Sequence, residues 1–225
     1  MKIVFLGDSL TWGKYGGDYV AEVAKLLPQH TIINAGIGGN TVLNLLKRVN
    51  DIMEDAPDGI FVMVGGNDAI SYTQPETRRY YEQVQKVPSG IVTPEQFSQA
   101  YRDLLTHIQL AHVLTWVGLE LGEYNPEVVS TLKQFNELAR EAAESVNVPV
   151  IDLMAHFPAP DNLPKRPPLN QAYINLIGKR ASSGWSDYET ERLRGGYTFT
   201  FDGLHITPET AEKMAKVIID FLDIQ

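Results

Sequence analysis

A serine, an asparagine and a histidine occur at positions where their side chains could act together in acyl transfer. Ser9 and Asn67 each follow closely after an apolar run, and His205 stands three residues after Asp202. A serine hydroxyl becomes a nucleophile when a neutral imidazole takes its proton, and a nearby carboxylate orients that imidazole. An asparagine amide is a neutral donor for the oxygen that becomes negative in a tetrahedral intermediate. These residue types therefore fit nucleophilic catalysis by a serine.

The elements that must position these residues alternate along the chain. Short runs of β-forming apolar residues predict strands at 3–6, 31–34, 59–64, 110–117 and 148–153. Helical patterns lie between them at 17–27, 42–53, from 94 onward and at 125–146, with a last helix from 208. Thr93 and Thr207 each precede a proline, which is typical of a capped helix start. This alternation predicts a parallel sheet with helices on both faces.

The expected strand order is 2-1-3-4-5, as in a flavodoxin-like three-layer α/β/α sandwich. In that order strand 1 lies between strands 2 and 3, so the loops that follow these three strands meet at one crevice. Ser9 lies in the first of these loops, a glycine-rich turn in the second, and Asn67 in the third. A glycine N–H can approach a ligand closely because no Cβ intervenes.

Four segments resemble the signature blocks of the GDSL, or SGNH, hydrolases. Gly7-Asp8-Ser9-Leu10 resembles the first block, and the segment 34–41 (Asn-Ala-Gly-Ile-Gly-Gly-Asn-Thr) resembles the second. Gly65-Gly66-Asn67-Asp68 matches the Gly-x-Asn-Asp block, and Asp202-Gly203-Leu204-His205 matches the Asp-x-x-His block. They occur in the order that the family shows. The resemblance covers the strand framework and both ends of the chain, and it implies the same 2-1-3-4-5 sheet.

The resemblance implies a serine esterase that hydrolyses carboxylic esters through an acyl-enzyme on Ser9. His205 would activate Ser9, and Asp202 would orient His205. The oxyanion hole would consist of the Ser9 N–H, the Gly39 N–H and the Asn67 side chain, with Gly38 in place of Gly39 if the loop is aligned one residue differently. The resemblance implies no cofactor and no metal. The expected partner is a small-molecule ester, and the sequence makes no prediction of oligomeric state.

Other interpretations stay open at this stage. An acyltransferase or a thioesterase would use the same site, and a catalytically inactive flavodoxin-like binding module would keep the fold without needing the site. His156 follows the fifth predicted strand and is a rival base, although no acidic residue stands beside it in a comparable pattern. The Gly36-x-Gly38 pair does not favour a dinucleotide, because it follows the second strand and Thr41 stands where a third glycine is required.

Composition and charge exclude several classes of protein. The chain has 225 residues, a net charge of −9 and no cysteine, so disulfides and thiolate catalysis are excluded. The acidic balance argues against non-specific binding to nucleic acid or to an anionic membrane. No apolar run approaches the roughly 20 residues that a membrane span requires. We expect one domain over 1–225 and, because no signal peptide is seen, a cytoplasmic location, although a trimmed secreted chain would look the same.

Two long segments, 71–93 and 157–200, fall outside the resemblance. Both would emerge at the carboxyl ends of the strands, above the crevice, and loops of this length are usually functional or disordered. We therefore expect them to form walls of the substrate site. The aromatic side chains predicted to contact substrate are Trp12, Tyr72, Trp185 and Tyr188.

Overall fold

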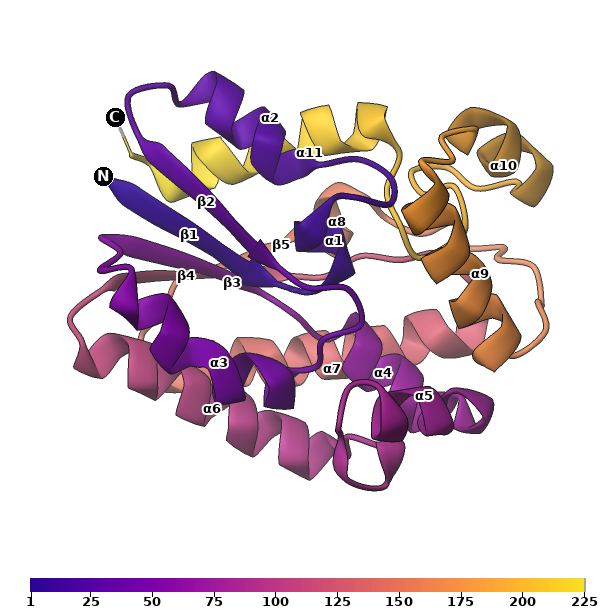
Figure 1. Ribbon diagram of the computed structural model, residues 1–225, viewed down its shortest axis with the longest axis horizontal. Coiled ribbons are helices and arrows are strands. Elements are labelled where there is room, and N and C mark those ends of the chain that lie inside the picture. Colours follow the sequence, from indigo (N-terminus) through magenta and orange to yellow (C-terminus); the bar gives the residue numbers. More distant parts are fainter. Residues whose placement is uncertain (225) are drawn as a thin grey trace.

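Five parallel strands form the centre of the structure, a computed structural model in which residues 1–224 are described (Figure 1). They are β1 (Lys2–Gly7), β2 (Thr31–Gly36), β3 (Gly59–Met63), β4 (Leu114–Leu119) and β5 (Val150–Asp152). Their order in the sheet is β2-β1-β3-β4-β5, which confirms the predicted flavodoxin-like arrangement. Gly7 at the end of β1 is in register with Gly36 of β2 and Met63 of β3. The loops after these three strands therefore start at the same level.

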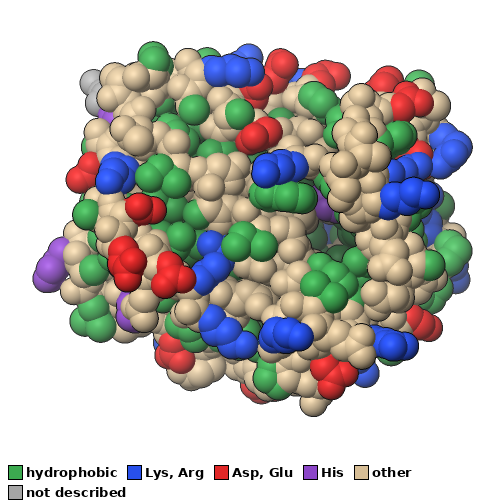
Figure 2. Space-filling view, in the orientation of Figure 1, with side chains coloured by type: hydrophobic (Ala, Val, Ile, Leu, Met, Phe, Trp, Pro, Cys, Tyr) green, Lys and Arg blue, Asp and Glu red, His purple; other side chains and the backbone are tan. Residues whose placement is uncertain are grey.

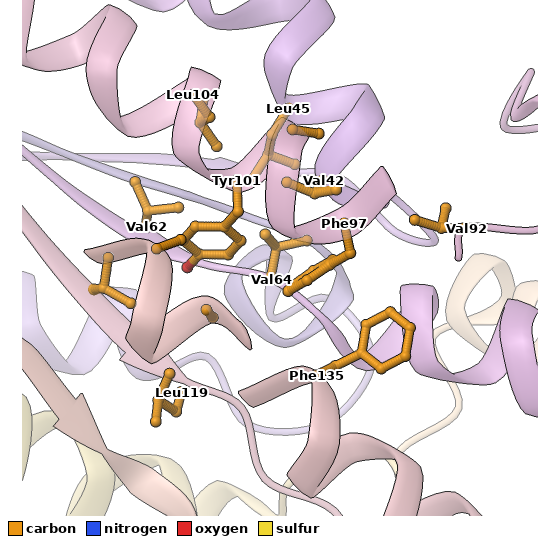
Figure 3. Packing of buried hydrophobic residues seen from close by; sticks show 14 of the residues in the cluster. Val42, Leu45, Val62, Val64, Val92, Phe97, Tyr101, Leu104, Leu119 and Phe135 are labelled. Carbon is orange, nitrogen blue, oxygen red and sulfur yellow. The ribbon is translucent and has the colours of Figure 1, made fainter. Parts of the chain in front are cut away.

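The central strands are apolar on both sides because helices cover both faces of the sheet. On one face lie α2 (Tyr19–Leu26) and α11 (Pro208–Leu222), and on the other lie α3 (Val42–Glu54), α6 (Pro94–Leu110) and α7 (Pro126–Ser145) (Figure 1). Successive residues of β1 alternate between the two cores: Val4 and Leu6 pack toward α3 and α6, whereas Ile3 and Phe5 pack toward α2 and α11. Figure 3 shows the larger core, where Tyr101 of α6 lies near Val62 of β3 and Phe97 lies beside Val64.

The fourth strand was predicted in the wrong place. The segment predicted as 110–117 begins with the last residue of α6, and β4 starts only at Leu114. Between them the chain turns at His112, which has a left-handed φ of 58°. Apolar content alone did not reveal the boundary, since Leu110 is an exposed helix residue and not a buried strand residue. The strand then runs two residues further than predicted, to Leu119, so that Glu120 follows directly.

The two long segments contain helices that the sequence pattern did not indicate. Segment 71–93 includes the end of α4 (Gly66–Thr73), the 3₁₀ turns at Pro75–Thr77 and Pro88–Gly90, and α5 (Arg78–Gln83). Segment 157–200 follows α8 (Leu153–His156) and contains α9 (Gln171–Ser183) and α10 (Tyr188–Gly195). Figure 1 shows α9 and α10 beyond the carboxyl ends of the strands. Within residues 1–224 no helix combines the length and apolarity needed to cross a bilayer.

Candidate active site

Ser9, His205 and Asp202 form a continuous hydrogen-bonded chain. Ser9 is the first residue of the short helix α1 (Ser9–Trp12), one residue after the Asp8 N-cap. Its Oγ lies 3.1 Å from Nε2 of His205, and Nδ1 of the same ring lies 2.8 Å from Oδ2 of Asp202. These are the contacts that a nucleophile, a base and an orienting acid require. The fold thus brings together three residues from opposite ends of the chain.

The carboxylate of Asp202 is fixed before it meets the imidazole. Its Oδ1 accepts hydrogen bonds from the backbone N–H groups of Leu204 (2.9 Å) and His205 (2.7 Å), which leaves Oδ2 for the ring. Burial disfavours the imidazolium, but attraction to Asp202, the hydrogen bond that the ring donates to Asp202 and the charge of Asp8 outweigh burial and raise the pKa of His205 above its usual 6.5. The ring is thereby suited to hold a proton.

A buried glutamate anchors the chain just before the turn that carries His205. Both carboxylate oxygens of Glu123 accept the Thr198 N–H, and Oε1 also accepts the N–H groups of Phe199 (2.9 Å) and Thr200 (2.8 Å). The hydroxyls of Thr198 and Thr200 donate to the same carboxylate. The residue has no measurable solvent exposure. No local sequence pattern marks Glu123, because its partners lie about 75 residues later along the chain.

Asn67 is held at both ends of its amide. Its Nδ2 donates to Oδ2 of Asp8 at 2.5 Å, and its Oδ1 accepts from the hydroxyl of Tyr81 at 2.9 Å. An amide nitrogen carries two N–H bonds, so one stays available to a ligand. Asn67 is the second residue of α4 and lines the same cavity as Ser9.

The glycine-rich turn after β2 also reaches this cavity. Gly38 and Gly39 both line it, and Gly39 has a left-handed φ of 80°. A Cβ at Gly39 would collide with the Tyr80 hydroxyl and with the Gln85 amide. Gln85 Nε2 in turn donates to the Gly38 carbonyl at 3.1 Å. The peptide between the two glycines is therefore fixed by α5 and the residues after it, and side chains are excluded at Gly39 for two separate reasons.

Two further buried carboxyl groups lie beside Asn67. Asp8 and Glu120 are 2% and 1% exposed, and both line the cavity. Burial raises the pKa of both groups, and the neighbouring Asp8 raises that of Glu120 further. Asp8 also caps α1 by accepting the Leu10 N–H at 3.0 Å. The position of Glu120 directly after β4 was not singled out from the sequence, since the predicted strand ended three residues earlier.

The cavity at the site has a volume of about 740 Å³ and a mainly apolar lining. Helix α9 contributes Ile174, Ile177 and Ala181, which recur at helical spacing, together with the polar Gln171, Asn175 and Ser182. Ile37 and Val84 belong to the lining contributed by the loop after β2 and the end of α5. In Figure 2 a hollow lies to the right of centre, with hydrophobic side chains in green around it. Both long segments of the chain thus border the site.

Of the four aromatic residues predicted to contact substrate, Trp12 lines the cavity, whereas Tyr72, Trp185 and Tyr188 are not part of its lining. Trp185 and Tyr188 pack against Tyr15, with ring centroids 6.1 and 6.3 Å away. Tyr188 also lies 4.6 Å from the ring of Phe201. Tyr15 and Phe201 in turn pack on the ring of His205, so Trp185 and Tyr188 lie behind this residue. Tyr72 is 38% exposed and packs on Phe135 of α7.

His156 and Asp68 do not take part in the hydrogen-bonded chain of Ser9, His205 and Asp202. His156 is an exposed residue of α8 and does not line the cavity. Asp68, next to Asn67, holds the start of α3 by accepting the Val42 N–H at 3.1 Å. Across residues 1–224 there is no group of three or more His, Asp or Glu side chains arranged to hold a metal ion.

Several solved structures share this fold. The fold resembles that of the acetyl xylan esterase AlAXEase, with a TM-score of 0.67 and 18% identity over 100% of both chains. It also resembles the acetylxylan esterase Axe2 from Geobacillus stearothermophilus (TM-score 0.65, 19% identity, 100% of this chain and 94% of that one). A lipase/acylhydrolase from Enterococcus faecalis gives a TM-score of 0.62 at 20% identity, covering 97% of this chain and 93% of that one.

At the level of sequence, an uncharacterized lipoprotein, YqeF, of Bacillus subtilis (strain 168) is 23% identical over 135 residues. That match spans 56% of each protein, so the chain corresponds to about half the length of this relative. The model of the GDSL-like lipase/acylhydrolase family matches residues 5–212, from β1 into α11. The matched range includes Ser9, Asn67, Asp202 and His205. This chain therefore belongs to the GDSL-like lipase/acylhydrolase family.

Proposed function

We propose that the chain hydrolyses carboxylic esters through an acyl-enzyme on Ser9. The observation that carries this proposal is the hydrogen-bonded chain from Ser9 Oγ through His205 to Asp202. His205 Nε2 takes the hydroxyl proton as Ser9 Oγ attacks the ester carbonyl carbon. The imidazolium then gives this proton to the leaving alcohol as the tetrahedral intermediate collapses to an acyl-Ser9. Water repeats the sequence, releasing the acid and restoring Ser9.

The oxyanion of the tetrahedral intermediate needs fixed donors. The Ser9 N–H is at the first position of α1, where no intrahelical acceptor exists. The Asn67 amide keeps one free N–H, and the constrained Gly39 peptide offers a third donor. Removing one such donor typically costs about 10²–10³-fold in kcat. We assign the oxyanion hole to these three groups.

The test of the nucleophile is direct detection of the covalent intermediate. The protein is mixed with a slowly hydrolysed p-nitrophenyl ester, quenched in acid and measured by intact mass, with Ser9→Ala as the control. We expect one acyl group per chain, located on the peptide that contains Ser9, and none on Ser9→Ala. Acylation that persists in Ser9→Ala, or turnover by that variant at more than a few per cent of the wild-type rate, would exclude the mechanism.

The cavity also favours one class of substrate. Binding pockets for whole small molecules measure about 300–1,000 Å³, and the 740 Å³ found here is much more than an acetyl group fills. Ile174, Ile177 and Ala181 of α9 offer apolar contacts to this cavity, and α9 also contributes the polar Gln171, Asn175 and Ser182 to the lining. We infer that the acyl portion of the substrate is an extended apolar chain. The solved structures with a similar fold include acetyl xylan esterases, and this cavity is better suited to a longer acyl group than acetyl.

A further inference from the structure

Glu120 is a buried acid without a basic partner. It is 1% exposed, and a lone ionised carboxylate in such a place costs several kcal/mol. The main influences on its pKa are burial, Asp8, the Gly66 N–H and Asp68, and they include no Lys or Arg. One carboxyl oxygen accepts the Gly66 N–H, while Oε1 has no N–H or O–H partner among the described residues. Its location therefore requires an explanation other than an ion pair.

The explanation lies in its contact with Asp8. Asp8 and Glu120 are both buried and accept hydrogen bonds from the neighbouring residues Asn67 and Gly66, and the negative charge of Asp8 raises the pKa of Glu120. Two buried carboxylates that repel one another are stabilised when one of them carries a proton. Asp8 already accepts the Leu10 N–H and the Asn67 amide, which favour its ionised form. Glu120 has a single backbone donor and is the better site for the proton.

The pair is attached to the residues that we assign to the oxyanion hole. Asp8 accepts from Nδ2 of Asn67, and Glu120 accepts from the N–H of Gly66, the residue before it. A Cβ at Gly66 would collide with the Glu120 carboxylate, so the contact leaves no room for a side chain there. The two carboxyl groups thus hold the Gly66 N–H and the Asn67 side chain at the start of α4.

We propose that Asp8 and Glu120 share a single proton and that this pair positions Asn67 toward the oxyanion. With one proton the pair is a compact, singly charged unit that aligns the amide. When the proton leaves, two adjacent carboxylates repel one another, and Asn67 and Gly66 lose their common support. We therefore expect kcat to fall at alkaline pH as the pair loses its proton. For its kinetic readout this inference rests on the proposed esterase function.

Other titratable groups face the pair and must be distinguished from it. Asp68 of α4 is buried, and burial raises its pKa well above the usual value. His205 is attracted to Asp8, and its ionisation governs the acidic side of the profile. The phenols of Tyr19, Tyr81 and Tyr101 surround the pair from α2, α5 and α6, and burial raises the pKa of each. Asp68 is thus the most informative control residue.

The kinetic experiment compares Glu120→Gln, Glu120→Ala and the matched control Asp68→Asn. Glutamine can donate to Asp8 and accept from Gly66, so it imitates the protonated acid permanently. We expect Glu120→Ala to lower kcat on the order of 10²-fold with a smaller change in KM, as for loss of an oxyanion donor. Glu120→Gln should recover most of that loss and abolish the alkaline fall in kcat, which Asp68→Asn should retain. The proposal would be overturned if Glu120→Gln and Glu120→Ala lowered kcat equally. It would also be overturned if the fall in kcat at alkaline pH disappeared in Asp68→Asn.

A spectroscopic measurement tests the shared proton without using activity. Infrared difference spectra of ¹³C-glutamate-labelled wild type and Glu120→Gln should show a protonated carboxyl band in the wild type at neutral pH. The band should vanish on alkaline titration in step with kcat. If the wild type shows no protonated glutamate at neutral pH, the proposal is wrong even if Ser9 is acylated as proposed. If the band is present but Ser9 is never acylated, the shared proton stands and the esterase mechanism fails.

Discussion

Placing a charge at Ile177 tests whether α9 forms the acyl-chain wall. Ile177 is half-buried and belongs to the apolar lining, whereas its neighbour Leu176 is 42% exposed and lies outside that lining. Ile177→Asp and Leu176→Asp therefore introduce the same charge one residue apart on the same helix. Only the first variant places the charge at the cavity.

The magnitude follows from apolar burial. Lengthening acetyl to octanoyl adds six methylenes, and burying about half of them at ~0.8 kcal/mol each gives ~2.4 kcal/mol, or roughly 60-fold in kcat/KM. If the aspartate displaces about two methylenes from the wall, the loss on octanoyl is ~1.6 kcal/mol, or roughly 15-fold. The acetyl ester does not extend that far and should change by less than about threefold.

The assay measures kcat/KM on p-nitrophenyl acetate, butyrate, hexanoate and octanoate for the wild type and both variants. We expect the wild-type value to rise with chain length, Ile177→Asp to flatten the rise, and Leu176→Asp to retain it. Thermal unfolding of each variant shows whether the fold is kept. The reasoning is refuted if the wild type prefers acetate, or if the two variants lose octanoate activity equally.

The remaining predictions concern residues that act on the same site. Asn67→Ala should lower kcat by about 10²–10³-fold with a smaller change in KM. A change confined to KM would show that Asn67 binds the substrate and does not stabilise the transition state. Because the pKa of His205 is raised above 6.5 and the base must be neutral, kcat/KM should fall as the pH drops through that raised value; a rate that is flat across that range would contradict His205 as the base. Trp185→Ala should lower the melting temperature and leave the ratio of kcat/KM on octanoate to kcat/KM on acetate unchanged. A selective loss of kcat/KM on octanoate would show instead that Trp185 contacts the substrate.

The parts of the site that could be predicted from the sequence are those specified over a few residues. Ser9 and Asn67 follow buried strands, and the strand order places their loops together. Asp202 and His205 stand on a single turn, so their pairing is local. The positions of these four residues could therefore be predicted from short motifs and from the order of the strands and helices.

The parts that could not be predicted depend on contacts between distant segments. Glu120 was missed because β4 was placed too early, and its partners Asp8 and Gly66 belong to other strand ends. Helix α9 has no fully buried residue, so its pattern lacks the strong apolar stripe that marks α3 or α11. Trp185 and Tyr188 were expected at the substrate because aromatic residues in a long segment suggest binding. In the structure they instead pack on one another and on Tyr15.

The anchor at Glu123 has a consequence for how such an enzyme can diversify. Its carboxylate binds the chain at Thr198–Thr200, just where the long segment containing α9 and α10 ends and the turn with Asp202 and His205 begins. Upstream of Thr198 we expect the segment to tolerate changes in length and sequence while the carboxylate keeps His205 in place. Contacts that cross this boundary must be kept, such as the hydrogen bond from the Tyr173 hydroxyl to the Asp202 carbonyl (2.9 Å) and the packing of Tyr188 on Phe201. Under the proposed function, the substrate wall can then be exchanged without moving the residues that carry out the reaction.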